Sequence, residues 1–148
     1  MFVVDTNVLV YAADESAPEH ARCRAVVEQC RHRHGAWFLT WGVVYEFLRV
    51  VTHPRVMRQP WTMEAGLGFV AALQESPGLA FLAPTNRHGA VMAEVVAEVP
   101  GLAGNIIHDA QTAVLMREHG IRRICTRDTD FHRFPFLEPI DPLRAGAF

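Results

Sequence analysis

The sequence predicts an α/β fold, in which a parallel sheet of four to five strands lies between helices that cover both of its faces. Short apolar runs typical of buried strands alternate along the chain with segments whose apolar residues recur at helical spacing. Parallel strands joined by helices need right-handed crossovers, which place helices against the sheet. The length of 148 residues suits a single domain, residues 1–148, with no room for a second.

The first part of the chain predicts a strand, an ambiguous segment and a helix. Residues 2–4 form a short apolar run that is halted by polar residues, as a buried strand would be. Residues 8–13 could extend this strand or form a short helix, and periodicity alone does not decide. Ser16 and Glu19 have the spacing of a capping box with a proline between them, which predicts a helix over residues 17–33.

The rest of the chain continues the alternation of strands and helices. Residues 37–39 resemble a second strand, after which Thr40 can cap a helix that contains Glu46 and stops before Pro54. The later elements are expected to be a helix from Thr62 to about Gln74, a strand over 79–82, a helix over 88–98, a helix over 105–119 that stops at Gly120, a strand over 124–125 and an edge strand near Leu137.

The net charge and the cysteine count exclude several classes of protein. The formal net charge is only −2, whereas a protein that coats nucleic acid through a broad basic surface is usually more basic. Cys23, Cys30 and Cys125 give an odd count without metal-knuckle spacing, so a disulfide framework or a zinc ribbon is disfavoured. The N-terminal residues resemble neither a signal peptide nor a membrane span. We therefore expect a cytoplasmic protein that does not bind membranes.

Four acidic residues carry the chemistry that the sequence predicts. Asp5 follows the first strand, Asp128 follows the fourth, Asp109 lies in the helix before that strand, and Glu46 lies in a mostly apolar helix. Ligands of such sheets bind outside the carboxyl ends of the strands, where these acids can converge. Carboxylates that close repel one another unless a hard divalent cation, Mg²⁺ or Mn²⁺, neutralises them. Such a site is typical of phosphodiester hydrolysis, which indicates cleavage of RNA or DNA.

Each acid also has a structural interpretation. Asp5 could be a turn or helix N-cap residue, Glu46 could lie on a solvated face, and Asp109 could complement a helix dipole. Asp128 and Asp130 lie in a polar turn, where aspartate is ordinary. Only the combination of these acids favours a metal site.

Several polar neighbours have open roles. Asn7 and Asn105 can support the pocket through hydrogen bonds or act as turn and cap residues. Thr126 can contact the metal through water or simply end a strand, and His108 stands beside Asp109. The other histidines are scattered, which disfavours zinc.

Four segments in order resemble PIN-domain ribonucleases, and most of all the VapC toxins of toxin–antitoxin pairs. These segments are Val4-Asp5-Thr6-Asn7-Val8-Leu9, Tyr45-Glu46-Phe47, His108-Asp109-Ala110 and Thr126-Arg127-Asp128-Thr129-Asp130-Phe131. The resemblance implies a PIN-like three-layer α/β/α sandwich with strand order 3-2-1-4-5. It also implies an endoribonuclease that leaves 5'-phosphate and 3'-hydroxyl ends.

The resemblance gives the four acids, Asp5, Glu46, Asp109 and Asp128, catalytic and metal-binding roles. Thr126 and Asp130 are their less certain neighbours. Asp5, Asp109 and Asp128 are expected to hold the principal metal, while Glu46 helps to orient or deprotonate the attacking water. The expected partners are a VapB-like antitoxin whose basic side chain enters the acidic pocket, an RNA of the tRNA or rRNA class, and a second copy in a homodimer.

The region from Met57 to Ala83 carries no motif of this family. The candidates for contacts with RNA phosphates and bases are Arg49, Arg55, Arg58, Arg87 and Trp61. For any one of them, a solvated surface position, or a packed one for Trp61, is the favoured interpretation.

Three other functions stay open from the sequence. The chain could be a PIN-type nuclease of RNA processing or of structured DNA, or a nonenzymatic module whose acids receive a basic peptide. A phosphotransferase with Asp5 as nucleophile is disfavoured, because no second aspartate stands two residues later.

Overall fold

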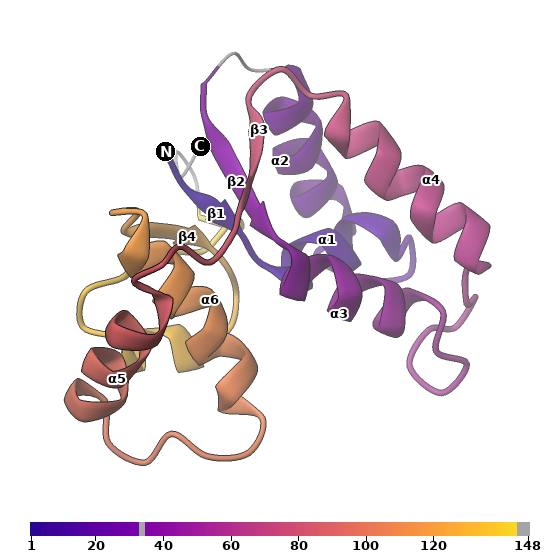
Figure 1. Cartoon of the computed structure of the whole chain (residues 1–148). Coiled ribbons are helices and arrows are strands. Elements are labelled where there is room, and N and C mark those ends of the chain that lie inside the picture. Colours follow the sequence, from indigo (N-terminus) through magenta and orange to yellow (C-terminus); the bar gives the residue numbers. More distant parts are fainter. Residues whose placement is uncertain (33–34, 145–148) are drawn as a thin grey trace.

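A computed structural model, which describes residues 1–32 and 35–144, has a parallel sheet with helices against both faces (Figure 1). The strands are β1 (Val3–Val4), β2 (Trp37–Thr40), β3 (Leu79–Leu82), β4 (Arg123–Cys125) and β5 (Glu138–Ile140). The helices are α1 (Thr6–Ala13), α2 (His20–His32), α3 (Trp41–Val51), α4 (Met63–Gln74), α5 (His88–Glu98), α6 (Ile106–Glu118) and a 3-10 helix, η1 (Thr129–Arg133). The order β3-β2-β1-β4-β5 confirms the predicted sheet.

Strand β1 is short but central, because it pairs with β2 on one side and β4 on the other. Val3 is in register with Phe38 and Ile124, and Val4 with Cys125. Successive side chains of a strand point to opposite faces, so Val3 and Val4 enter different cores. The carboxyl ends of β1 and β4 therefore meet at one edge of the sheet.

Two apolar cores fill the space on the two faces of the sheet. One contains Val4 with the buried sides of α1, α2, α3 and α4, and the other contains Val3 with those of α5 and α6. Figure 1 shows the same division, with α1 to α4 on one side of β1 and β4 and with α5 and α6 on the other. The three-layer arrangement predicted by the resemblance is confirmed.

The ambiguous segment after the first strand is helical. Asp5 lies at the N-cap of α1 and accepts a hydrogen bond of 2.7 Å from the amide of Thr6, which satisfies one of the donors that a helix start leaves free. The chain thus turns directly from β1 into α1. This turn brings the Asp5 side chain to the edge of the sheet.

The predicted start of the second helix is wrong. Helix α2 begins at His20, and the amide of Cys23 donates to the carbonyl of Glu19, so the capping position is three residues after Ser16. Ser16 instead donates both its amide and its hydroxyl to Asp14, because an aspartate two residues earlier forms a competing local turn. The predicted end at residue 33 lies outside the described residues.

The end of helix α6 follows the prediction. Gly120 has a φ of +68°, a left-handed conformation that glycine adopts without steric cost. The amide of Ile121 donates to the carbonyl of Met116 over 2.8 Å, which closes the helix as a Schellman motif does. Among the described residues, no helix is both long and apolar enough to cross a membrane.

Candidate active site

Asp5 is both a helix cap and a member of a polar pocket. Its side chain is buried, with an exposed fraction of 7% for the residue. One oxygen accepts from the amide of Thr6, while Oδ2 accepts from Nδ2 of Asn7 at 2.6 Å and from the hydroxyl of Thr126 at 2.6 Å. The N-cap interpretation and the pocket interpretation of Asp5 therefore hold together.

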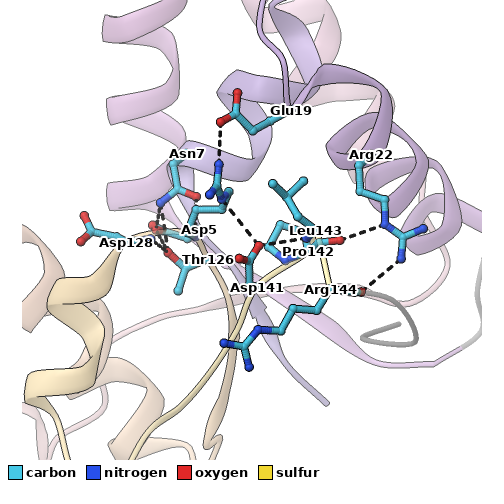
Figure 2. A network of polar contacts seen from close by, with 11 residues as sticks. Asp5, Asn7, Glu19, Arg22, Thr126, Asp128, Asp141, Pro142, Leu143 and Arg144 are labelled. Atoms are coloured by element: carbon cyan, nitrogen blue, oxygen red, sulfur yellow. Dashed lines mark hydrogen bonds and ion pairs between the residues drawn. The ribbon is translucent and has the colours of Figure 1, made fainter.

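Asn7 joins α1 to the segment after β4. Its Nδ2 also donates to Oγ1 of Thr126 at 3.0 Å, and its Oδ1 accepts from the amide of Arg127 at 3.1 Å. The same Thr126 hydroxyl oxygen accepts from the amide of Asp128 at 2.9 Å. The supporting role predicted for Asn7 thus has direct contacts, as Figure 2 shows for Asn7, Asp5, Thr126 and Asp128. Asn105 occupies the N-cap position of α6, but in the part of the chain that the structure describes its side chain makes no capping hydrogen bond.

Glu46 reaches the same region from α3. Its Oε2 accepts a hydrogen bond of 3.2 Å from the hydroxyl of Thr6, and Oε1 lies 3.4 Å from Nη2 of Arg49. Helix α3 starts directly after β2, with Thr40 capping the amide of Val43 at 3.1 Å. The side of α3 that carries Glu46 therefore faces the edge of the sheet.

The carboxylates of Asp109, Asp128 and Asp130 form a compact cluster. One oxygen from each lies within 4.8 Å of the others. Asp109 and Asp128 are half-buried and Asp130 is exposed. The 3-10 helix η1 brings Asp130 close to Asp128. Oδ1 of Asp128 accepts a hydrogen bond of 2.8 Å from the amide of Asp130, and the chain turns at this point. Asp130, which the resemblance gave only as a less certain neighbour, thus lies next to two of the predicted acids, Asp109 and Asp128.

A small cavity of about 20 Å³ joins the remaining acids to this cluster. Asp5, Glu46 and Asp109 line it, together with the exposed His108. The sequence interpretation gave no role in the site to the five other lining residues, Thr6, Gly42, Val43, Gln111 and Thr112. A Cβ added to Gly42 would lie 3.1 Å from the side-chain oxygen of Gln111, so α3 and α6 approach closely here, which no local sequence pattern indicates.

Burial and mutual repulsion raise the pKa values of two acids. Burial raises the pKa of Asp5 from 3.8 to about 6, although the hydrogen bonds from Thr126 and Thr6 oppose this shift. Burial also raises the pKa of Asp109 to about 7, and the negative charges of Asp128 and Asp5 add to it. Both carboxylates are therefore costly to ionise without a nearby cation.

The residues predicted to contact RNA lie in different settings. The ring of Trp61 packs edge-on against Phe47 and Phe69, with centroid distances of 6.1 and 5.7 Å, in line with the packed alternative. Arg49 pairs with Glu46. The other arginines with this predicted role are exposed: Arg55, Arg58 and Arg87.

A wider groove lies elsewhere, between α1, α2 and α4. Its volume is about 590 Å³, and Arg24, Arg31, Arg58 and Trp61 are among its lining residues. None of the four predicted acids lines it. The candidate active site is therefore defined by its charges and not by a large hollow.

The donor set fits a hard divalent cation. The clustered carboxylates supply the oxygen ligands that Mg²⁺ and Mn²⁺ prefer. The raised pKa values of Asp5 and Asp109 are the expected sign of anionic groups gathered without their counter-ion. Among the described residues, no cysteine or histidine belongs to the cluster, so the site favours hard metals over zinc.

Comparisons with known proteins agree with this architecture. The family model of the PIN domain matches residues 2–137. Ribonuclease VapC48 of Mycobacterium tuberculosis is 32% identical over 138 residues, which are 93% of this chain and 94% of the relative. Ribonuclease VapC33 of the same organism is 30% identical over 144 residues, or 97% of this chain and 99% of the relative.

Solved structures share the fold at lower sequence identity. The crystal structure of VapC20 of Mycobacterium tuberculosis, a sarcin–ricin loop cleaving toxin, has a TM-score of 0.64 at 17% identity, covering 89% of this chain and 93% of that one. VapBC2 from Rickettsia felis, bound to a DNA fragment from its promoter, has a TM-score of 0.63 at 15% identity, covering 95% and 98%. These similarities concern the arrangement of the helices and strands.

Proposed function

The chain belongs to the PIN domain family and, within it, to the VapC ribonucleases, and we propose that it is the endoribonuclease toxin of a VapBC toxin–antitoxin pair. The observation that carries the proposal is the acidic cluster, in which oxygens of Asp109, Asp128 and Asp130 lie within 4.8 Å of one another. Asp5 and Glu46 line the adjoining cavity. A chain with this site and with ribonuclease relatives over almost its whole length is best explained as a nuclease.

We assign metal binding chiefly to Asp5, Asp109 and Asp128. A bound Mg²⁺ or Mn²⁺ ion supplies Lewis-acid chemistry for phosphodiester hydrolysis. The hydrogen bonds from Asn7 and Thr126 hold the Asp5 carboxylate in place before any cation arrives. Asp130 is close enough to Asp109 and Asp128 to be a further ligand.

Glu46 is assigned to the attacking water. Its carboxylate accepts a hydrogen bond from the hydroxyl of Thr6 and lines the same cavity as Asp109. Its second oxygen is within reach of the exposed Arg49 and remains accessible from solvent. Such a group can orient a water and accept its proton, which is the role of a general base.

The proposed partners follow from the family and from the charge of the site. A VapB-like antitoxin would silence the site by placing a basic side chain against the carboxylates, since a guanidinium forms charge-assisted bonds to them. We also propose an RNA substrate of the tRNA or rRNA class, and a homodimer. The buried thiols of Cys23 and Cys125 suit a reducing compartment such as the cytoplasm.

The test is RNA cleavage by purified wild type, Asp5→Asn and a matched control, Glu75→Gln, whose acid is exposed at the end of α4. Each protein is incubated with total RNA in Mg²⁺, Mn²⁺ or EDTA, and new 5'-phosphate ends are mapped by sequencing. We expect discrete cuts with wild type and Glu75→Gln in metal, and none with Asp5→Asn or EDTA. Equal cleavage by Asp5→Asn would disprove the site.

A second measurement separates a toxin from a nuclease of RNA processing. Expression of the wild type should arrest growth. A gene for a small DNA-binding antitoxin directly upstream, whose co-expression restores growth, is expected for a toxin and not for a nuclease of RNA processing. Calorimetry with Mn²⁺ separates both from a nonenzymatic peptide-binding module, because that module has no need to bind metal.

A further inference from the structure

The segment between β4 and η1 carries two site residues with a basic residue between them. Thr126 contacts Asp5, and Asp128 belongs to the acidic cluster. Arg127 stands between them, and its amide donates to Asn7. Any displacement of Arg127 therefore moves both Thr126 and Asp128.

The Arg127 side chain is bound to two acids outside the cluster. Its Nη1 lies 2.5 Å from Oε1 of Glu19, just before α2, and its Nε lies 3.6 Å from Oδ1 of Asp141, just after β5. The Arg127 and Glu19 side chains are 32% and 19% exposed, so water screens this pair less than it screens a surface pair. In Figure 2, Glu19 and Asp141 lie on the other side of Asp5 and Thr126 from Asp128.

The acceptors of Arg127 are themselves held in place. Asp141 accepts from the amide of Leu143 at 2.9 Å, and the carbonyl of Pro142 accepts from Nε of Arg22, a residue of α2, at 3.0 Å (Figure 2). The C-terminal segment is thereby fastened to the helix that follows Glu19. Arg127 thus links the Thr126–Asp128 segment to the start of α2 and to the end of β5, which are themselves joined by a hydrogen bond.

The carboxylates of the acidic cluster must be held in place against their mutual repulsion. Oxygens of Asp109, Asp128 and Asp130 lie within 4.8 Å of one another, and carboxylates that close repel one another when no cation lies between them. This repulsion pushes the segment with Asp128 away from α6. A short ion pair behind the segment opposes that displacement, and binding is stronger when the ligands are already in place.

Resting on the proposed function, we propose that Arg127 is a positioning residue, whose ion pair with Glu19 and Asp141 holds the Thr126–Asp128 segment in its metal-binding arrangement. The guanidinium touches neither the substrate nor the metal in this role. Arg127 acts through the backbone, by fixing the positions of its neighbours Thr126 and Asp128. Its effect should therefore be seen in metal affinity and not in the chemical step.

The test is calorimetric titration of Mn²⁺ into wild type, Arg127→Ala, Arg127→Lys and a control, Arg117→Ala. Arg117 forms an equally short pair with Glu98, 2.5 Å, between α5 and α6, and its side chain is 27% exposed. We expect Arg127→Ala to weaken Mn²⁺ binding roughly tenfold, as loss of residues that support metal ligands does. Arg127→Lys should recover only part of the affinity, because one ammonium replaces a guanidinium that reaches both Glu19 and Asp141. Arg117→Ala should bind as the wild type does.

RNA cleavage at increasing Mn²⁺ gives a second readout. For Arg127→Ala the Mn²⁺ concentration at half-maximal rate should rise while the maximal rate returns to that of the wild type. A lower maximal rate at saturating metal, or unchanged Mn²⁺ affinity, would overturn the positioning role. Failure of the wild type itself to bind Mn²⁺ would instead overturn the proposed function.

A double mutant distinguishes positioning from inhibition. Glu19→Gln and Arg127→Ala should weaken binding together no more than the stronger single change, because both break one interaction. If Glu19→Gln weakened binding and adding Arg127→Ala restored it, a released Arg127 would be competing with the metal, and the positioning role would be wrong.

Discussion

The hydroxyl of Thr126 donates a hydrogen bond of 2.6 Å to Oδ2 of Asp5, across 121 positions of the sequence. Both side chains are buried, with exposed fractions of 3% and 7%. This bond opposes the effect of burial and lowers the pKa of Asp5. Thr126 therefore does more than end a strand, because it keeps a buried carboxylate available as an anion.

Replacing Thr126 by Val should damage the site while keeping the shape of the side chain. The change removes the donor to Asp5 and the acceptor of the amide of Asp128. Leaving such buried groups unsatisfied costs about 1–3 kcal/mol of unfolding free energy. We expect lower stability by chemical denaturation and weaker Mn²⁺ binding. Thr126→Ser retains the hydroxyl and should stay close to the wild type; equal losses in the two variants would contradict this interpretation.

Asp109→Asn should separate stability from activity. The uncharged amide avoids the burial and the repulsion that raise the pKa of Asp109 to about 7. We expect the metal-free protein to gain about 1 kcal/mol at pH 8, where the wild-type acid is ionised, and to lose RNA cleavage. Denaturant unfolding in EDTA measures the first effect. A destabilised Asp109→Asn would mean that the carboxylate makes a favourable contact that repulsion does not outweigh.

The stability of the metal-free protein should fall as pH rises. The native pKa values of Asp5 and Asp109, about 6 and about 7, exceed the ordinary value of 3.8, so the native state binds more protons between these limits. The resulting stabilisation is complete below the ordinary value and is lost as pH rises through 6 to 7.

Thermal unfolding in EDTA and in Mn²⁺ tests this pH dependence. Mn²⁺ should raise the Tm strongly at about pH 8 and little at about pH 5, because protons and metal compete for the same carboxylates. Asp109→Asn should flatten the curve in EDTA. A Tm gain from Mn²⁺ that does not vary with pH would place the metal at other residues.

Much of the fold could be predicted because it depends on local patterns. The apolar runs at 2–4, 37–39 and 79–82 became strands, and Gly120 ended α6 through its own backbone freedom. The start of α2 could not be predicted from the Ser16 capping pattern, because Asp14 competes for the same Ser16 donors. Which of the two turns forms depends on the backbone geometry, and the spacing of the residues in the sequence does not determine that geometry.

The convergence of the acids could be predicted from the sequence, and the contacts that support them could not. Asp5, Glu46, Asp109 and Asp128 lie where the ends of β1, β2 and β4 meet, as sheet topology requires. The close approach of Gln111 to the backbone of Gly42 and the ion pair of Arg127 with Glu19 join segments far apart in sequence. Only the packing of α3 on α6, and of α2 beside the site segment, brings these residues together.

Glu46→Gln should distinguish metal binding from activation of water. The amide oxygen of glutamine can still accept the hydrogen bond from Thr6, which is 3.2 Å in the wild type, so the side chain should keep its position. It cannot accept a proton, and loss of a general base lowers kcat by about 10²-fold to 10⁴-fold. We expect the Kd for Mn²⁺ from calorimetry to stay within about threefold of the wild-type value, because the carboxylates assigned to the metal, Asp5, Asp109 and Asp128, are unchanged. Single-turnover cleavage at saturating Mn²⁺ measures the chemical step separately. If Mn²⁺ binding disappears together with cleavage, Glu46 is a metal ligand first, and the proton must pass to another group.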